Sequence, residues 1–309
     1  MKFTLKDYRG VIPALMTPFD KNGLFDRKCA EEMIEWHISQ GVGGFYLTGS
    51  NGHGPYMTPE ERMRTVEEFT AIVNGRLPVV AHVACVSPTV SARLAKHAEE
   101  CGCTGVSGVP SYYYKLTPDQ MYRYYAEIAS ASDLPFVIYA KTADYPPSVP
   151  MFKRLAEIPN VKGLKFTGPD HYMMGRIKEA LGEDFMVYSG RDEMFLSGLL
   201  SGADGIIGGT YNVLPDLYIR GVKKLNEGKV KEAQKDMLAA NAILEVMFPY
   251  DGSLAAPMRA CYEFMGVNSG YNPSPIADLT EEQKLKLKNE LKALKDKLNI
   301  EPIALFDAI

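Results

Sequence analysis

A single pattern recurs eight times between Gly10 and about Gly228: a short apolar run, a turn of small or polar residues, and a segment with helical periodicity. Strands that alternate with helices in this way form a parallel sheet, because a crossover helix must return the chain to the same edge before the next strand. Eight units fit closure into a (β/α)8 TIM barrel better than an open doubly wound sheet, so we predict an α/β barrel. The apolar runs lie at Val11–Met16, Gly43–Leu47, Pro78–Ala84, Thr104–Val109, Pro135–Ala140, Val161–Phe166, Phe185–Ser189 and Asp204–Gly208.

Several of the intervening segments begin with residues that start helices. Thr58-Pro59-Glu60-Glu61 combines an N-cap threonine, a proline at the first helical position and a glutamate that completes a capping box. Thr117-Pro118-Asp119-Gln120 repeats the arrangement with glutamine, Ser87-Pro88 opens a third helix, and Ser148 is a candidate N-cap of a fourth. These signals support helices between the strands.

The rest of the chain, residues 229–309, is predicted to be an all-helical extension of a catalytic barrel at residues 1–228. Helical periodicity covers Lys229–Phe248, Leu254–Met265 and Glu281–Leu298. We expect three helices packed on the barrel or on another subunit, since the last segment has a leucine stripe typical of a packing face. The stripe consists of Leu285, Leu287, Leu291, Leu294 and Leu298.

Composition narrows the class of function. Of 309 residues, 23% are charged, the net charge is −4, and no basic run is interleaved with aromatic residues, which argues against a nucleic-acid partner. No apolar run approaches the ~20 residues of a membrane span, and Met1 to Gly10 has no apolar core of a secretory signal. The Cys-x-Cys pair, Cys101 and Cys103, has no second pair at metal-binding spacing. We therefore expect a cytoplasmic protein with reduced cysteines, no metal site and no membrane partner.

Lys165 is the residue with the most distinctive chemistry. In the sixth apolar run, strand alternation places Lys165 on the same face as Val161 and Gly163, with Leu164 and Phe166 on the face that helices cover. The ordinary interpretation is a lysine that extends from the strand end to water. A lysine enclosed by the barrel is costly unless it is paired, neutralised or used. An uncharged amine is the nucleophile that attacks a ketone to form a Schiff base.

Other polar residues lie where the predicted strands end, which is where barrel enzymes have their active sites. Each has a structural explanation when taken alone, because glycines make turns, aspartate caps helices and tyrosines fill apolar gaps. Together they would place an amine, phenols, a hydroxyl and a turn rich in N–H groups around one opening, as a Schiff-base enzyme acting on a 2-oxo acid needs. The candidates are Gly49-Ser50-Asn51-Gly52, Tyr112, Tyr139, Lys165, Thr167, Gly190, Asp192, Glu193 and Gly209.

In this hypothesis, Lys165 condenses with the ketone, and the resulting iminium withdraws electrons. The turn Gly49-Ser50-Asn51-Gly52 offers N–H and hydroxyl donors to the substrate carboxylate. Tyr139 takes the proton from the substrate hydroxyl before the carbon–carbon bond breaks. A phenol with a pKa near ~10 is a poor base at neutral pH, so a neighbouring cation or a hydroxyl relay must assist it, with Ser50 and one of the clustered tyrosines as candidates.

At these residues the chain resembles the pyruvate-dependent class I aldolase superfamily that contains N-acetylneuraminate lyase and dihydrodipicolinate synthase. The resemblance covers nearly the whole chain and implies Lys165 as the Schiff-base lysine and Tyr139 as the proton carrier. It also implies Ser50 and Tyr112 as relay partners, with Tyr112 reaching in from an adjacent subunit of a homotetramer, and no metal or organic cofactor. The matching motifs, highly specific as a set, are Gly10–Phe19, Gly49-Ser50-Asn51-Gly52, Tyr139, Gly163-Leu164-Lys165-Phe166-Thr167 and Gly202-Ala203-Asp204-Gly205.

The segment Ser189-Gly190-Arg191-Asp192-Glu193 is similar to the Gly-x-Asp-Glu segment of sialic acid lyases. The resemblance implies that its glycine, aspartate and glutamate hold the hydroxyl groups of an open-chain sialic acid, and that Thr167 lines the same groove. Adjacent carboxylate acceptors suit a polyhydroxylated substrate on physical grounds as well. Asn51 and Gly209 complete the expected substrate-binding set.

Five positions depart from the family pattern. His53 stands where most members have glutamate, and Asn51 stands where threonine is usual. The pair Ser50-Asn51 is similar to the corresponding pair in 4-hydroxy-2-oxoglutarate aldolases. Ala140 replaces an asparagine, and Gly209 replaces a serine of sialic acid lyases. The synthases have an arginine at the position of Asp144, where it receives a second carboxylate, so an acidic residue there argues against that activity.

Three hypotheses follow. The first is a lyase that cleaves N-acetylneuraminate, or a close relative, reversibly to pyruvate and N-acetylmannosamine. The runner-up keeps the mechanism but acts on a 2-keto-3-deoxy sugar acid or on 4-hydroxy-2-oxoglutarate. The third, a silent 2-oxo-acid sensor or assembly subunit, is supported only by His53 and Ala140, while the presence of both Lys165 and Tyr139 weighs against it.

Overall fold

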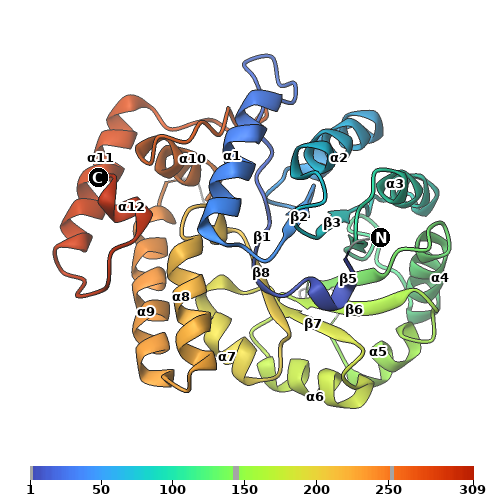
Figure 1. Ribbon diagram of the computed structural model, residues 1–309. Helices are drawn as coiled ribbons and strands as arrows, with labels where there is room; N and C mark the ends of the chain where they lie inside the picture. The colour runs from blue at the N-terminus through green and yellow to red at the C-terminus, as the bar shows by residue number, and fades with distance from the viewer. Residues whose placement is uncertain (1–2, 142–145, 251–253) are drawn as a thin grey trace.

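The computed structural model describes residues 3–141, 146–250 and 254–309, and within them eight parallel strands form the barrel. The strands follow the order β1-β8-β7-β6-β5-β4-β3-β2, and a parallel bridge between Ala14 and Tyr46 brings β1 back beside β2. The predicted (β/α)8 TIM barrel is therefore confirmed (Figure 1). The strands are β1 Gly10–Pro13, β2 Phe45–Leu47, β3 Val79–His82, β4 Gly105–Gly108, β5 Phe136–Ala140, β6 Val161–Phe166, β7 Met186–Ser189 and β8 Gly205–Gly208.

A helix follows each strand and covers the outside of the barrel (Figure 1). The predicted helix starts are confirmed. Thr58 and Thr117 each form a complete capping box, and the side chains of Ser87 and Ser148 accept hydrogen bonds from backbone N–H groups in the first turn. The helices are α1 Arg27–Gln40, α2 Pro59–Val73, α3 Pro88–Glu100, α4 Pro118–Ala129, α5 Val149–Leu155, α6 His171–Leu181, α7 Phe195–Leu200 and α8 Pro215–Asn226.

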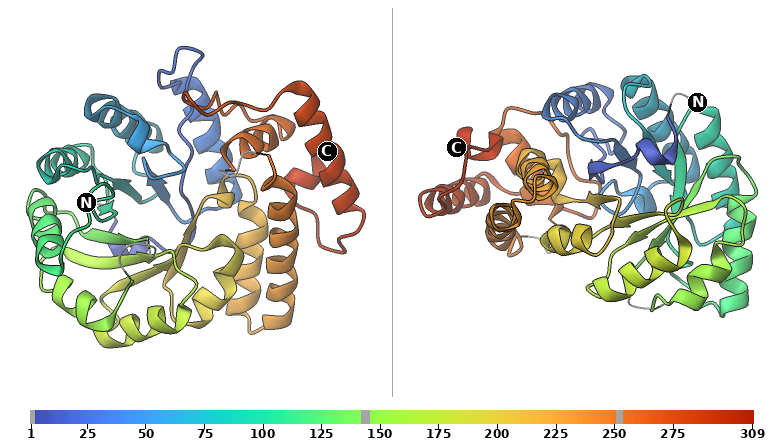
Figure 2. Two further views of the ribbon diagram at one scale, coloured as in Figure 1. Left: turned by 180° about the vertical axis from the view of Figure 1, so that it is seen from behind. Right: turned by 60° about the horizontal axis from the view of Figure 1, so that its bottom comes forward.

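The C-terminal helices gather at one side of the barrel, next to α1 and α8, in all views (Figures 1 and 2). Each of the three predicted helical segments contains one, and a short fourth helix, α12, was not predicted. None of the helices in the described ranges is both long enough and apolar enough to cross a bilayer. The helices are α9 Val230–Met247, α10 Ala255–Phe264, α11 Glu281–Lys295 and α12 Ala304–Asp307.

The predicted leucine stripe is wrong at one position. Leu287 and Leu291 are fully buried against the rest of the tail, but Leu285 is 61% exposed. A step of two positions along an α-helix turns the side chain by ~200° around the axis, so Leu285 and Leu287 cannot share one face.

Side chains inside the barrel form a cluster separate from the layer between strands and helices. The interior cluster includes Tyr46, Val137, Tyr139 and Tyr188. The prediction that Val161 faces the interior with Lys165 is wrong, because Val161 packs in the outer layer. The pairing of β5 with β6 shifts register after Phe136, and such an irregularity breaks strict alternation.

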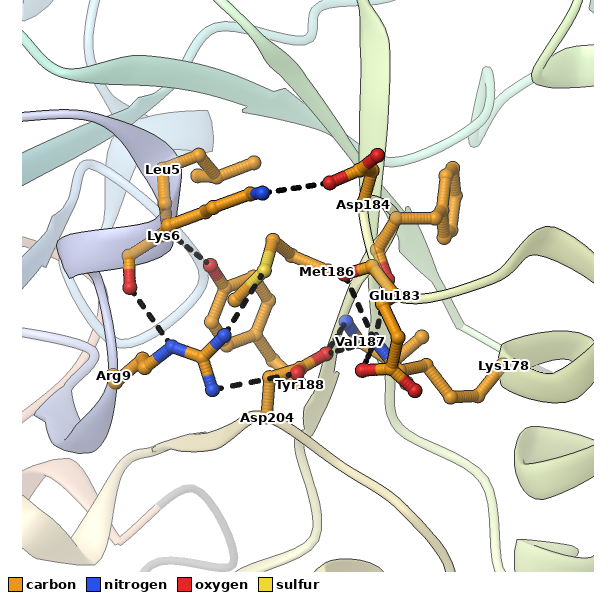
Figure 3. Close-up of polar contacts among 11 residues, drawn as sticks. Leu5, Lys6, Arg9, Lys178, Glu183, Asp184, Met186, Val187, Tyr188 and Asp204 are labelled. Carbon is orange, nitrogen blue, oxygen red and sulfur yellow. Dashed lines mark hydrogen bonds and ion pairs between the residues drawn. The ribbon is translucent and has the colours of Figure 1, made fainter.

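The N-terminal end of the barrel is closed by a 3-10 helix, η1 Leu5–Asp7, and by a group of ion pairs (Figure 3). The Tyr188 hydroxyl donates to the Leu5 carbonyl at 3.3 Å. Asp204 accepts hydrogen bonds from the Lys178 Nζ at 2.9 Å and from the Val187 N–H at 2.8 Å, and lies 3.6 Å from an Arg9 nitrogen. These contacts seal one end of the barrel and leave its other end as the accessible one.

Candidate active site

Lys165 lies near the carboxyl end of β6 and is enclosed by the barrel, with only 4% of its surface exposed. Its Nζ lies 4.2 Å from the ring centre of Tyr139 and 4.5 Å from that of Tyr46. Tyr139 is its register partner on β5, so strand pairing itself brings the amine to the phenol. The interpretation of Lys165 as a lysine that extends to water does not agree with this geometry.

A cavity of about 250 Å³ opens above Lys165 at the carboxyl ends of the strands. Nine of the ten residues that were predicted to act in catalysis or to bind substrate line it, which brings side chains from β5 and β6 together with the turns after β2, β6, β7 and β8. These nine are Ser50, Asn51, Tyr139, Lys165, Thr167, Gly190, Asp192, Glu193 and Gly209.

The tenth residue, Tyr112, is not brought to this cavity. Tyr112 is 55% exposed, and the neighbouring Tyr113 and Tyr114 are 75% and 64% exposed. Among the described residues that line the cavity, Tyr139 is the one tyrosine, and the hydroxyl of the nearby Tyr46 donates to Ser107 at 2.9 Å.

Tyr139 has a pKa below its ordinary value. Burial raises the pKa of this phenol, but the positive charges of Lys165 and Lys141 and a hydrogen bond with Thr167 together lower it by more. A phenol with a lowered pKa accepts and returns a proton more readily near neutral pH. From the sequence we expect a cation or a hydroxyl relay to assist Tyr139, and the structure offers Lys165 and Lys141 as cations.

The turn after β2 has a fixed backbone. The His53 N–H donates to the Ser50 carbonyl at 3.1 Å, and the Gly54 N–H donates to the Gly49 carbonyl at 3.1 Å. Gly52 has no space for a side chain, because a Cβ there would lie 2.9 Å from the Leu15 carbonyl oxygen. The imidazole of His53 is buried between Phe19 and Tyr56, away from the cavity, which agrees with a packed loop histidine.

The carboxylate of Asp192 is held by Thr210. Its Oδ2 accepts hydrogen bonds from the backbone N–H and the hydroxyl of Thr210, both at 2.7 Å. Burial raises the pKa of Asp192 in spite of these two hydrogen bonds, which lower it. Glu193 accepts a hydrogen bond from Arg191 at 2.6 Å, and its carbonyl accepts one from Asn241 of α9 at 3.1 Å. Both acids are thus oriented before any substrate arrives.

Gly190 must be glycine for Lys165 to reach the cavity. A Cβ at Gly190 would overlap the Thr167 hydroxyl and lie 3.2 Å from the Lys165 Cε. The Thr167 hydroxyl is buried beside the Tyr139 phenol, and a hydrogen bond between the two is among the causes that lower the pKa of Tyr139. It lies at the cavity, where a ligand can contact it.

Sequence reasoning missed several residues that line the cavity. Lys141 directly follows strand β5, and its position at a strand end was the signal that could have found it. Leu244, Phe248 and Met258 form an apolar wall from α9, its C-terminal end and α10. No sequence signal marks them, because their periodicity indicates only packing. Asp144, one of the departures from the family pattern, lies outside the described residues.

In the described part of the chain, no group of three histidine, cysteine, aspartate or glutamate side chains is arranged to hold a metal ion. The cavity instead combines an amine, a phenol with a lowered pKa, a turn with free donors, and oriented acids. That set suits addition of the amine to a carbonyl, followed by proton transfer.

Comparison with known proteins agrees with this chemistry. Residues 7–294 match the model of the dihydrodipicolinate synthetase family. An N-acetylneuraminate lyase of Mediterraneibacter gnavus is 33% identical over 282 residues, 90% of each chain. One of Escherichia coli (strain SMS-3-5 / SECEC) is 36% identical over 242 residues, 77% of this chain and 81% of that one. The solved structure of wild-type Ruminococcus gnavus sialic acid aldolase has a TM-score of 0.88 and 31% identity, covering 94% of this chain and 99% of that one.

Proposed function

The chain belongs to the dihydrodipicolinate synthetase family, and on this premise we propose that it is a Schiff-base lyase that cleaves N-acetylneuraminate reversibly to N-acetylmannosamine and pyruvate. The main support is the enclosed amine of Lys165, 4.2 Å from the ring centre of Tyr139 at the base of a cavity lined with polar groups. The relatives named above support the choice of substrate.

The reaction begins when the Lys165 amine adds to the ketone and water leaves, which gives an iminium. Tyr139, as phenolate, takes the proton of the hydroxyl on the carbon to be released. The carbon–carbon bond breaks, the new aldehyde departs, and the bonding electrons pass into the iminium to give an enamine. Protonation and hydrolysis of that enamine release pyruvate and restore the amine. Because the iminium accepts the electrons, the mechanism requires neither a metal nor an organic cofactor.

Each end of the substrate has its own set of contacts in this proposal. Donors of the turn at Ser50 bind the carboxylate. Thr167, Asp192 and Glu193 accept hydrogen bonds from the sugar hydroxyls, together with the backbone at Gly190. Tyr112 joins the proton relay from an adjacent subunit of a cytoplasmic homotetramer, which accounts for its exposure in a single chain.

Trapping with borohydride tests the Schiff base. Pyruvate followed by borohydride should add one reduced pyruvate unit to the peptide that contains Lys165. Lys165→Arg, which keeps the charge but removes the nucleophile, should give no adduct. An unmodified Lys165 in the unaltered protein would contradict the proposal.

The substrate requires a second assay, because the Ser50-Asn51 pair also suits 4-hydroxy-2-oxoglutarate. We expect pyruvate release from a panel of 2-oxo acids to show the largest kcat/KM for N-acetylneuraminate. A larger value for 4-hydroxy-2-oxoglutarate or a 2-keto-3-deoxy sugar acid would keep the mechanism and change the substrate. Pyruvate binding without turnover of any substrate would favour a sensor.

A further inference from the structure

We propose that the side chain of Asn51, on the turn after β2, occupies the space that a side chain at position 209 would fill if that residue were not glycine. In this position its carboxamide selects among substrates by binding the hydroxyl groups of their chain. This inference rests on the proposed function, because it concerns which 2-oxo acid the Lys165 site accepts. Asn51 and Gly209 are two of the departures from the family pattern, and the inference explains them together.

The two residues occupy the same space. A Cβ built on Gly209 would overlap the Asn51 Nδ2, and would lie 3.1 Å from its Cγ and 3.3 Å from its Oδ1. The carboxamide therefore lies against the Cα of Gly209, past the end of β1, the one strand between β2 and β8. Both residues line the cavity that contains Lys165.

The backbone on each side of this contact is held in place. The Asn212 side chain donates to the Gly209 carbonyl at 2.7 Å, and the Thr210 N–H next to it donates to Asp192 at 2.7 Å. The turn that contains Asn51 is fixed by the hydrogen bond from His53 to Ser50. A side chain added at position 209 would thus move the flexible carboxamide and leave both backbones in place.

The carboxamide of Asn51 forms no hydrogen bond with any residue in the described ranges. Asp192, by contrast, already accepts hydrogen bonds from Thr210, and Glu193 accepts one from Arg191. A carboxamide both donates and accepts, and so it can bind a hydroxyl group in either sense. Its place beside the end of β8 puts it near the acids proposed for the sugar chain, which also line this cavity.

The test is a double-mutant cycle of Asn51→Thr and Gly209→Ser, measured as the ratio of kcat/KM for N-acetylneuraminate to that for 4-hydroxy-2-oxoglutarate. Each single variant should lower this ratio about tenfold, because it removes or displaces the carboxamide. The double variant should return to within about threefold of the starting ratio, because the serine hydroxyl then occupies the vacated space. Thermal unfolding should change little in all three, because only a flexible side chain moves.

Gly208→Ala provides the matched control. A Cβ there would overlap Asp192 and approach a Tyr211 ring carbon to 2.6 Å, and none of the three atoms nearest to it belongs to Asn51. Asn51→Thr should therefore fail to rescue Gly208→Ala.

Trapping of pyruvate on Lys165 separates the possible failures. Normal trapping with additive effects of the two single variants, or with equal losses on both substrates, would overturn this inference and leave the proposed function intact. Equal losses would place the carboxamide at the carboxylate that all these substrates share. Absence of the adduct in the unaltered protein would overturn the proposed function, and this inference with it.

Discussion

At the scale of single residues, Lys165 and Tyr139 depend on each other electrostatically. The cation of Lys165 is among the charges that lower the pKa of Tyr139. An iminium on Lys165 retains a positive charge at the same place, so the phenolate stays favoured after the substrate has bound. In the proposed mechanism, Lys165 thus both forms the covalent bond and favours the phenolate of Tyr139 that acts as the base in the next step.

Tyr139→Phe should separate these two roles. We expect kcat to fall about 10²- to 10⁴-fold, because the variant loses the group that takes the substrate proton. Trapping of pyruvate on Lys165 should persist, since addition of the amine does not require cleavage. Tyr188→Phe, at the sealed end of the barrel, serves as the control and should retain activity. Wild-type turnover in Tyr139→Phe would remove Tyr139 from the mechanism.

Lys141→Met should shift the dependence of the rate on pH. Loss of its positive charge destabilises the phenolate, so the pKa of Tyr139 should rise and the rate should reach its plateau at higher pH. Lys141 is exposed, so we expect a shift of about half a pH unit that becomes smaller at high salt. The exposed Lys162 on β6 offers a control, Lys162→Met, that should leave the profile unchanged. A profile that moves to lower pH would contradict the assignment.

At the scale of helices and strands, Leu287→Ala and Leu285→Ala test the face that α11 presents to the tail. Leu287 is fully buried, and its truncation should lower the free energy of unfolding by about 3 kcal/mol. Leu285 is 61% exposed, and its truncation should change that free energy by less than about 0.5 kcal/mol. Denaturant unfolding measures both, and similar losses would restore the stripe that the sequence predicted.

Local signals in the sequence were sufficient for most elements. The threonines at positions 58 and 117 marked helix starts because a capping box is complete within four residues. Lys165 and Tyr139 were predictable because each strand ends at the same face of a barrel. Val161 was not, since its orientation depends on a register shift between two strands far apart in sequence. The wall formed by Leu244, Phe248 and Met258 depends on how the tail docks, which no local pattern encodes.

At the scale of the whole molecule, Asp204 joins three parts of the chain at the sealed end of the barrel (Figure 3). Its side chain is 7% exposed and contacts Lys178 of α6, the backbone of β7 and Arg9 near the N-terminus. The lysine is itself only 11% exposed, so its charge would lose its main partner if the carboxylate were removed.

Asp204→Asn should therefore lower the free energy of unfolding by about 3 kcal/mol, because a largely buried ammonium then keeps only the exposed Glu183, 3.9 Å away, as an opposite charge. The activity of the folded fraction should remain, since the site lies at the opposite end. Asp184→Asn breaks the exposed pair with Lys6, drawn in the same view, and should leave stability unchanged (Figure 3). Equal stability of the two variants in denaturant unfolding would contradict this interpretation of the network.

The apolar wall from α9 and α10 has a consequence for the order in which the molecule becomes functional. Synthesis on the ribosome delivers Lys165 and Tyr139 well before Leu244, Phe248 and Met258. A nascent chain that has completed its eighth strand thus carries the reactive amine with one flank open to water. Completion of the chamber around Lys165 is therefore tied to α9 and α10, which emerge only after the whole barrel has been synthesised.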